Sequence, residues 1–318
     1  MDDGRAQIAV LSWRKYGLIF EPNKNGRWAH SHAQLPVPVM LSNGRCRVFF
    51  AGRDNNQRSH VGWFDINLDE PTHIIEVSPQ PVLEPGNPGF FDGDGIYVAS
   101  AVRTGDRKLR LYTIGWNAGA RPPLFYASIG AAESDDDGLI CSKRGKSPIL
   151  ARSEFDPCLV TSPVVIRDEH GWKMWYVSGF DWVDTTSGLQ SHYHIKYAYS
   201  NNGLDWIREG RVCMESTLPD ETKISRFWVL HKNQKYHAWY SYHRGHGYRI
   251  GYATSIDGLD WIRKDDEAGM SVSLSGWDSE AIAYPSVIEF DGKFYMFYNG
   301  NRFGIDGVGL AISDVRDL

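Results

Sequence analysis

Five short segments stand directly ahead of predicted β-strands, and four of them carry Asp or Glu. They span residues 30–32, 92–95, 154–157, 220–223 and 277–280. Two carboxyl groups held about 5–10 Å apart can act on a glycosidic bond as acid and base, or as acid and nucleophile. Crowded carboxylates also raise one another's pKa, which a general acid at neutral pH requires. The candidate catalytic residues are Asp94, Asp156, Glu221 and Glu280.

Further polar and aromatic residues in these segments, in the first strands and at the ends of the aromatic second strands could bind the substrate. Sugar hydroxyls need polar partners, and the apolar face of a sugar stacks on an aromatic ring. Arginine forks suit carboxylate and phosphate groups, so the four arginines in this set predict an anionic substrate. The predicted substrate-binding residues are His30, His32, Arg53, Asp54, Asp92, Trp116, Arg226, His243, Arg244, Asp278, Asn301 and Arg302. We predict no metal site and no cofactor.

The elements that must position these residues are repeated along the chain. The clearest copies are YAYSNNGLDWIR at 197–208 and YATSIDGLDWIR at 252–263. Fainter copies bring the number of repeats to five. In each repeat an aromatic strand comes before the copy, and another strand comes before the aromatic one. The aromatic strands lie at 48–54, 111–117, 174–182, 238–245 and 296–304. We expect Pro38, Ser100, Pro163, Phe227 and Pro285 to be in register, because their spacings are 62, 63, 64 and 58 residues.

This repeat predicts an all-β fold, a five-bladed β-propeller with four antiparallel strands in each blade. The last repeat lacks a fourth strand, and residues 8–20 resemble the missing one. We therefore expect this N-terminal strand to join the last blade and close the ring, which leaves no open edge. The whole chain, 1–318, is then one domain with blades at about 28–85, 92–150, 156–215, 221–270 and 278–318. In the fourth blade, Arg226 would point a cation at the axis or pair with a carboxylate of a neighbouring blade.

Composition excludes several other classes of protein. Hydrophobic residues make up 42% and charged residues 23%, which is typical of a globular chain. The longest apolar runs are far shorter than the ~20 residues of a membrane helix, and the acidic N-terminus is unlike a secretory signal. A net charge of −5 argues against nucleic-acid partners. The four scattered cysteines predict no zinc site or disulfide framework, so we expect reduced thiols and a cytoplasmic protein. The sequence does not indicate an oligomeric state.

The sequence resembles the five-bladed propeller glycosidases of glycoside hydrolase families 32, 43, 62, 68 and 130. It is more similar to cytoplasmic glucosyl hydrolase-like proteins found near bacterial surface-polysaccharide and modified-sugar genes. The resemblance covers roughly residues 8–315. It is carried by FAGRDNNQRSHVGWFDI at 50–66, FDP at 155–157, YHIKYAYSNNGLDW at 193–206, YRIGYATSIDGLDW at 248–261 and GWDSEAIAYPSV at 276–287.

The resemblance implies roles for the carboxylates. Asp156 matches the middle Asp of the family triad, which orients the substrate and tunes the acid. The acid would be Glu221 or Glu280, and the base Asp54, Asp92 or Asp94. Two departures affect this assignment. His30 and His32 stand where families 32 and 43 have an Asp, and 95–100 reads GIYVAS in place of the acidic segment of family 130.

Three functions follow from these observations. The first is a glycoside hydrolase-like enzyme that cleaves or transfers an anionic or activated sugar in bacterial glycan or modified-sugar metabolism. The second is a phosphorylase or a glycosyltransferase on the same scaffold, which the histidines in place of Asp favour. The third is a carbohydrate-binding propeller without catalysis. The sequence does not indicate the identity of the sugar, its linkage or the stereochemical outcome of the reaction.

Overall fold

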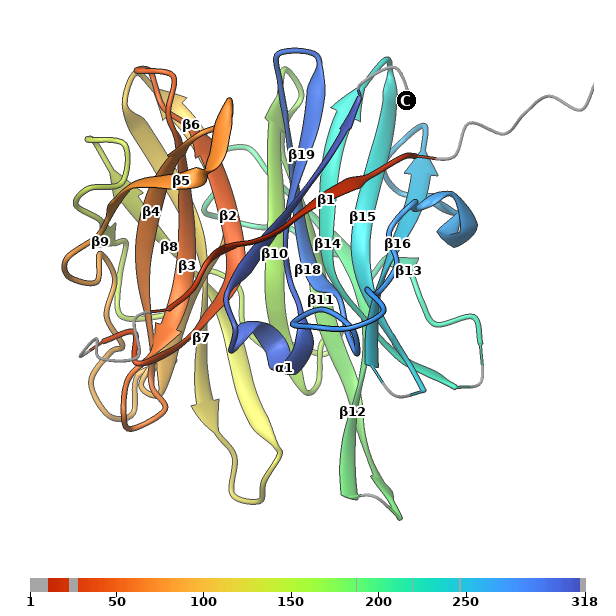
Figure 1. Ribbon diagram of the computed structural model, residues 1–318. Coiled ribbons are helices and arrows are strands. Elements are labelled where there is room, and N and C mark those ends of the chain that lie inside the picture. Colours follow the sequence, from red (N-terminus) through yellow and green to blue (C-terminus); the bar gives the residue numbers. More distant parts are fainter. Residues whose placement is uncertain (1–10, 23–27, 187, 219, 246, 315–318) are drawn as a thin grey trace, which may run out of the picture.

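The computed structural model describes residues 11–22, 28–186, 188–218, 220–245 and 247–314. This part of the chain consists of β-strands and two short helical turns, η1 (Asp265–Glu267) and α1 (Asn301–Gly304) (Figure 1). The predicted all-β fold class is confirmed. Within the described residues, no helix is long and apolar enough to cross a membrane.

In the described residues the strands form five consecutive groups, and neighbours within a group pair antiparallel. The first group has β2 (Ser31–Met40), β3 (Cys46–Arg53), β4 (Ser59–Asn67) and β5 (Glu70–Val77). The second has β6 (Gly95–Gly105), β7 (Lys108–Ala118), β8 (Phe125–Ser134) and β9 (Ser142–Lys143). The third has β10 (Leu159–Asp168), β11 (Gly171–Thr185), β12 (Gly188–Ser200) and β13 (Val212–Met214). The fourth has β14 (Glu221–Lys232), β15 (Lys235–Arg244), β16 (Gly247–Ser255) and β17 (Ile262–Arg263).

The last group takes its outer strand from the N-terminal end of the chain. Its strands are β18 (Ala283–Phe290), β19 (Lys293–Asn299), β20 (Val308–Asp314) and β1 (Arg14–Phe20). β1 runs antiparallel to β20, with Arg14 opposite Ile312 and Phe20 opposite Val308 (Figure 1). The predicted closing strand began at residue 8, and residues 8–10 lie outside the described residues. The sheets of the described chain are open, and single parallel bridges link β4 to β6 and β12 to β14.

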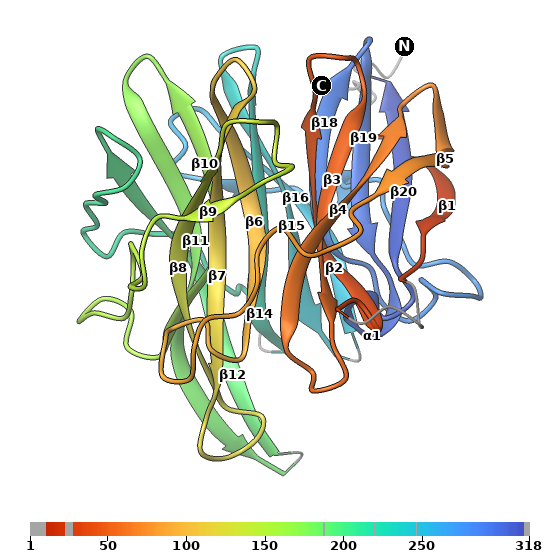
Figure 2. The same cartoon turned by 90° about the vertical axis from the view of Figure 1, so that its left-hand side faces the viewer.

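The first strands of the five groups face one another around a common centre. β2 contacts β6, β6 contacts β10, β10 contacts β14, β14 contacts β18, and β18 contacts β2. Figure 2 shows the groups standing side by side, with β6 and β14 inside the body. The second strands pack behind them through fully buried rings such as Phe49, Trp175 and Trp239. The aromatic strands seen in the sequence are therefore core strands that hold the first strands in place.

Each first strand is interrupted by a β-bulge. Because of these bulges, the residues that are equivalent between groups differ from those that the sequence predicts. Pairing places Val37 opposite Phe49, and Ser100 opposite Tyr112. The residues that precede these two, Pro36 and Ala99, are therefore equivalent to Pro163, Phe227 and Pro285. The predicted alignment of Pro38 and Ser100 with the other three residues is wrong, because a bulge adds residues to one strand and so shifts the pairing from what the spacing along the chain implies. In four strands the residue before this position has a positive φ of 45–56° (Leu35, Ser162, Arg226 and Tyr284).

Candidate functional site

A pocket of about 610 Å³ opens at one end of the centre where the first strands meet. All five first strands contribute to its lining, through Gln34, Tyr97, Thr161, Ser225 and Tyr284 among others. This volume lies within the roughly 300–1,000 Å³ of sites that bind small molecules. The sequence predicted that the first strands converge on one shared mouth, and we name this cavity the axial pocket.

The axial pocket carries positive charge that no carboxylate among its described lining residues neutralises. Arg53 donates from Nε to Gln34 Oε1 at 3.2 Å and from Nη2 to the Tyr97 hydroxyl at 3.5 Å. The ammonium group of Lys223 has no hydrogen-bond or ion-pair partner among the described residues, and its Nζ lies 5.6 Å from the centroid of the Tyr193 ring. Burial lowers the pKa of Lys223. The described residues that line the pocket include no Asp or Glu.

Tyrosine hydroxyls supply the remaining polar character of the axial pocket. Tyr97, Tyr193, Tyr248 and Tyr284 all line it. Burial raises the pKa of Tyr248 to about 12, and burial together with neighbouring tyrosines raises the pKa of Tyr284 well above its ordinary value. These two hydroxyls therefore stay protonated and can donate hydrogen bonds. Because cations and O–H donors prevail in the lining, the pocket suits a ligand with negative charge.

The carboxylates predicted to be catalytic or substrate-binding lie mostly elsewhere, inside their own strand groups. Asp156 is 0% exposed. Its Oδ2 accepts a hydrogen bond from Arg208 Nη1 at 2.7 Å, and its Oδ1 lies 3.5 Å from Lys196 Nζ. The Tyr176 hydroxyl is 3.3 Å from both carboxylate oxygens. These contacts occupy Asp156 within the third group, where it connects the segment before β10 to the segment after β12.

The same arrangement recurs in three other groups. Each acid precedes a first strand, or begins it in the case of Glu221, and each cation comes from the outermost strand of that group. The pairs are Asp92 with Lys143 at 2.5 Å, Glu221 with Arg263 at 2.8 Å, and Asp278 with Lys15 at 2.7 Å. We name these three pairs and Asp156–Arg208 the carboxylate clamps. All four acids are buried. Each clamp ties the start of a first strand to the outer edge of its group, so the repetition of these acids has a structural cause.

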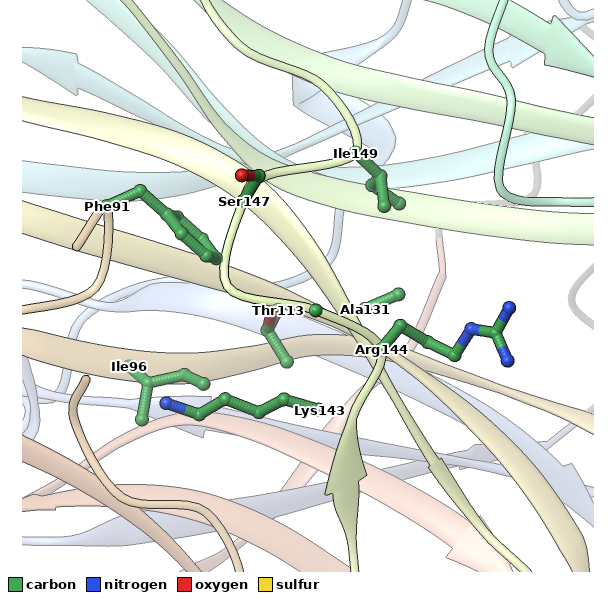
Figure 3. A pocket seen from close by; sticks show the side chains of 9 residues that line it. Phe91, Ile96, Thr113, Ala131, Lys143, Arg144, Ser147 and Ile149 are labelled. Carbon is green, nitrogen blue, oxygen red and sulfur yellow. The ribbon is translucent and has the colours of Figure 1, made fainter. Parts of the chain in front are cut away.

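A small cavity in the second group illustrates why a clamp is not a sugar site. Figure 3 shows Lys143 extended beside Ile96 and Thr113, below the chain that carries Ser147. The cavity holds about 60 Å³. That is well under the roughly 300 Å³ of the smallest ligand pockets, and the amine of Lys143 is already paired with Asp92.

Of the other predicted residues, Arg53 and Trp116 line the axial pocket. Trp116 donates from Nε1 to the Ser59 hydroxyl at 2.9 Å. His32 is half-buried near the pocket mouth. Burial, together with the positive charges of Arg53 and Arg302, lowers its pKa to about 4. His32 is therefore neutral at pH 7. No group of three or more His, Cys, Asp or Glu side chains in the described chain is placed to hold a metal ion.

The remaining predicted residues lie outside the pocket lining. Several have local partners: Asp94 accepts from the Ala118 amide, Asp54 from His60, and Asn301 from the Glu280 and Ala281 amides, while Arg244 pairs with Asp220 and Arg302 with Asp306. His30 is exposed. Burial, and then the charge of Lys223, lowers the pKa of the half-buried His243. Glu280 is exposed, and its carboxylate, like that of Asp94, has no ion pair in the described chain, whereas Asp156 and Glu221 are paired with arginines.

Arg226 lies at the centre of the molecule and is fully buried. Its guanidinium donates to the backbone oxygens of Ala99 at 2.7 Å, Pro36 at 3.0 Å and Pro285 at 3.4 Å. These three carbonyls belong to equivalent positions of three other groups. The prediction of a cation at the axis agrees with this placement, but the alternative of a salt bridge to a neighbouring carboxylate is wrong, since the partners in the described chain are backbone carbonyls.

Sequence reasoning missed most of the pocket lining. In the sequence, Lys223 lies in an acidic segment, and no pattern separates Tyr97, Tyr193, Tyr248 and Tyr284 from the many other strand aromatics. One signal was available: Tyr284 directly precedes the aligned Pro285, and the equivalent Leu35 and Ser162 also line the pocket. Finding it required the correct register, which the bulges hide.

Several solved structures that resemble this chain in fold are described as glycoside hydrolases. No protein-family model matches the chain. A glycosyl hydrolase from Bacteroides ovatus superposes with a TM-score of 0.72 at 15% identity, covering 96% of this chain and 94% of that one. A structure from the GH130 family of mannoside phosphorylases, which contains glycoside hydrolases acting on β-1,2-mannosidic linkages, gives 0.71 at 15% identity, with 95% and 94% covered. A thermostable family-43 glycoside hydrolase gives 0.65 at 14% identity, with 92% and 91% covered. The chain has the glycosidase-like propeller fold.

Two proteins of Mycobacterium tuberculosis are similar to this chain in sequence. The uncharacterized protein Rv1502 of Mycobacterium tuberculosis strain H37Rv is 36% identical over 302 residues, which is 95% of this chain and 99% of that protein. The uncharacterized protein MT1551 of strain CDC 1551 matches to the same extent. The chain belongs to the same family as these two proteins.

Proposed function

We propose that this chain is a carbohydrate-active protein that binds an anionic sugar, such as a sugar phosphate or a sugar carboxylate, in the axial pocket. The observation that carries the proposal is the pair of cations, Arg53 and Lys223, in a lining whose described residues include no carboxylate. The fold supports a sugar as the ligand, since the neighbours described above are glycosidases. Trp116 and Tyr193 offer ring faces for the sugar.

We also propose that the chain is a single five-bladed propeller, 1–318, with blades at about 28–85, 92–150, 156–215, 221–270 and 278–318. The cyclic contacts of the five first strands support this count. The pairing of β1 with β20 supports closure of the ring by the N-terminal strand. In this arrangement the axial pocket is one mouth of the central channel.

Binding should depend on the unpaired lysine. Lys223→Met is expected to weaken the binding of an acidic sugar about 10- to 100-fold, because a hydrogen bond to a charged group contributes roughly 1.5–3 kcal/mol. Isothermal titration with glucose 6-phosphate, glucose 1-phosphate and glucuronate, beside neutral glucose, measures this effect. Arg244→Gln is the matched control, because Arg244 is exposed and paired with Asp220 outside the pocket. Equal affinity for neutral and acidic sugars, together with unchanged binding by Lys223→Met, would overturn the proposal.

A second candidate function is phosphorolysis of a glycoside, and the same cationic lining favours it over hydrolysis. Hydrolysis by a carboxylate pair needs a base or nucleophile beside the acid. Inorganic phosphate is already ionised, and Arg53 and Lys223 are suited to hold it. A phosphate oxygen would bond to the anomeric carbon while the glycosidic C–O bond breaks. Glu280, whose carboxylate has no ion pair in the described chain, would give its proton to the leaving oxygen.

This reaction predicts a separation of binding from turnover. Glu280→Gln is expected to reduce phosphate-dependent cleavage about 100-fold or more, since general acid catalysis contributes about 10²–10⁴, while phosphate affinity stays unchanged. Release of sugar 1-phosphate from a panel of glycosides, with and without phosphate, is the measurement. Glu289→Gln serves as a control, because Glu289 forms a surface pair with Lys232. Cleavage that needs no phosphate would reject phosphorolysis in favour of hydrolysis.

A further inference from the structure

Two arms extend beyond the axial pocket on the same side of the molecule. One is the hairpin that joins β11 to β12, and the other is the connection from β7 to β8; both project past the other hairpins (Figures 1 and 2). Their tips are joined by an ion pair between Arg121 and Asp184 at 2.9 Å. Nearer the body, the rings of Phe125 and Trp182 make an edge contact with centroids 5.7 Å apart. The arms therefore stand together as one wall.

The side of the arms that lines the pocket is apolar. It is formed by Pro122, Pro123, Leu124, Phe125, Trp182 and Leu189, with Ser191 as a polar member on β12. The same cavity holds Arg53, at the end of β3, and Lys223, on the first strand β14 where it bridges to Tyr193 of β12. The pocket thus combines a cationic end near the first strands with an apolar wall that continues outward along the arms.

We propose that the ligand is an anionic sugar that carries an apolar substituent, with the charged sugar held by Arg53 and Lys223 and the apolar group packed along the arms. This inference rests on the proposed function for the identity of the charged end. It adds a second subsite, formed by the arm residues, that selects an amphiphilic glycoside over a free sugar acid or sugar phosphate.

Two observations support an apolar substituent rather than a second sugar. A further sugar would need several hydrogen-bond partners, and the pocket-lining part of the arms from Pro122 to Phe125 offers side chains without donors or acceptors. The edge contact between Phe125 and Trp182 also continues this apolar lining from one arm to the other, where Leu189 lines the pocket as well. Burial of such surface contributes roughly 25 cal/mol per Å², so an alkyl or aryl group gains affinity there without polar contacts.

Alkyl phosphates test this subsite without knowledge of the sugar. The probes are inorganic phosphate, hexyl phosphate and hexanol, titrated calorimetrically into the full-length protein. Hexyl phosphate is expected to bind at least about tenfold more tightly than inorganic phosphate. Trp182→Ala should remove this gain and leave the affinity for inorganic phosphate unchanged. Leu189→Ser, a smaller change on the same wall, should remove part of the gain if Trp182→Ala proves poorly folded.

Tyr126→Ala is the matched control, because Tyr126 follows Phe125 directly, is exposed, and lies outside the pocket lining. If phosphate binds in a Lys223-dependent way and the hexyl chain adds no affinity, the apolar subsite is refuted while the proposed function stands. If neither phosphate compound responds to Lys223→Met, the anionic site itself fails. A change of oligomeric state in Trp182→Ala, seen by light scattering, would assign the wall to self-association and also overturn the inference.

Discussion

Replacing Asp156 by asparagine is expected to lower the free energy of unfolding by about 3–5 kcal/mol, the cost of breaking a buried ion pair from one side. The amide keeps the shape of the side chain but removes its charge. Arg208, at 2.7 Å, and the buried Lys196, at 3.5 Å, are then left as cations without their counter-charge inside the third group. Urea unfolding followed by tryptophan fluorescence measures the loss. Any loss of binding should accompany unfolding.

The control is the same chemical change at the surface. Asp260→Asn also removes an acid that pairs with an arginine, Arg211, but both side chains are largely exposed. Exposed pairs contribute about 0–1 kcal/mol, so this variant should unfold close to the wild type. If Asp156→Asn keeps wild-type stability and loses only turnover of a glycoside, Asp156 acts on the substrate and the structural account of the carboxylate clamps is wrong.

The sequence predicts the strands of this protein well and its site poorly, for one physical reason. Residues that recur in the repeats are those with the same structural role in every strand group. These roles are to form the aromatic second strand and to fix the start of the first strand. Asp92, Asp156, Glu221 and Asp278 recur because they fill the second role, so their regular spacing indicates a scaffold. A ligand site differs from group to group, since each group contributes a different side chain to one asymmetric pocket.

Lys223 and Tyr284 show why such residues are hard to find in a sequence. Neither has a counterpart of the same type in the other groups, and each faces the centre because of local backbone geometry. The register shift between Glu221 and Lys223 on β14, and the positive φ of 56° at Tyr284, are the local irregularities at these two positions. Arg53 and Trp116, which the sequence predicts as substrate-binding residues, line the pocket from second strands, and the pairing of these strands with the third strands has no register shift.

Replacing Arg226 by methionine is expected to destabilise the protein by about 3 kcal/mol or more. The guanidinium donates to three backbone oxygens, of which that of Pro36 also accepts from the Ser286 hydroxyl, so the oxygens of Ala99 and Pro285 lose their side-chain donor, and each buried acceptor left without a donor costs about 1–3 kcal/mol. Removal of a buried charge offsets part of this loss, since burial lowers the pKa of Arg226 to about 9. The orphaned oxygens outweigh that gain, because methionine offers no donor to any of the three. Thermal and urea unfolding measure the difference.

Arg226→Lys and Arg244→Met separate the causes of this effect. The lysine variant keeps the charge but cannot reach three divergent carbonyls with one ammonium, so its stability should fall between those of Arg226→Met and the wild type. Arg244→Met removes an exposed arginine and should cost about 1 kcal/mol or less. Because Ser225 and Tyr284 line the pocket and adjoin Arg226 and Pro285, ligand affinity should fall in Arg226→Met even where the protein remains folded. Wild-type stability of Arg226→Met would show that the carbonyls of Pro36, Ala99 and Pro285 need no shared donor, and the three groups would then be held together by apolar packing alone.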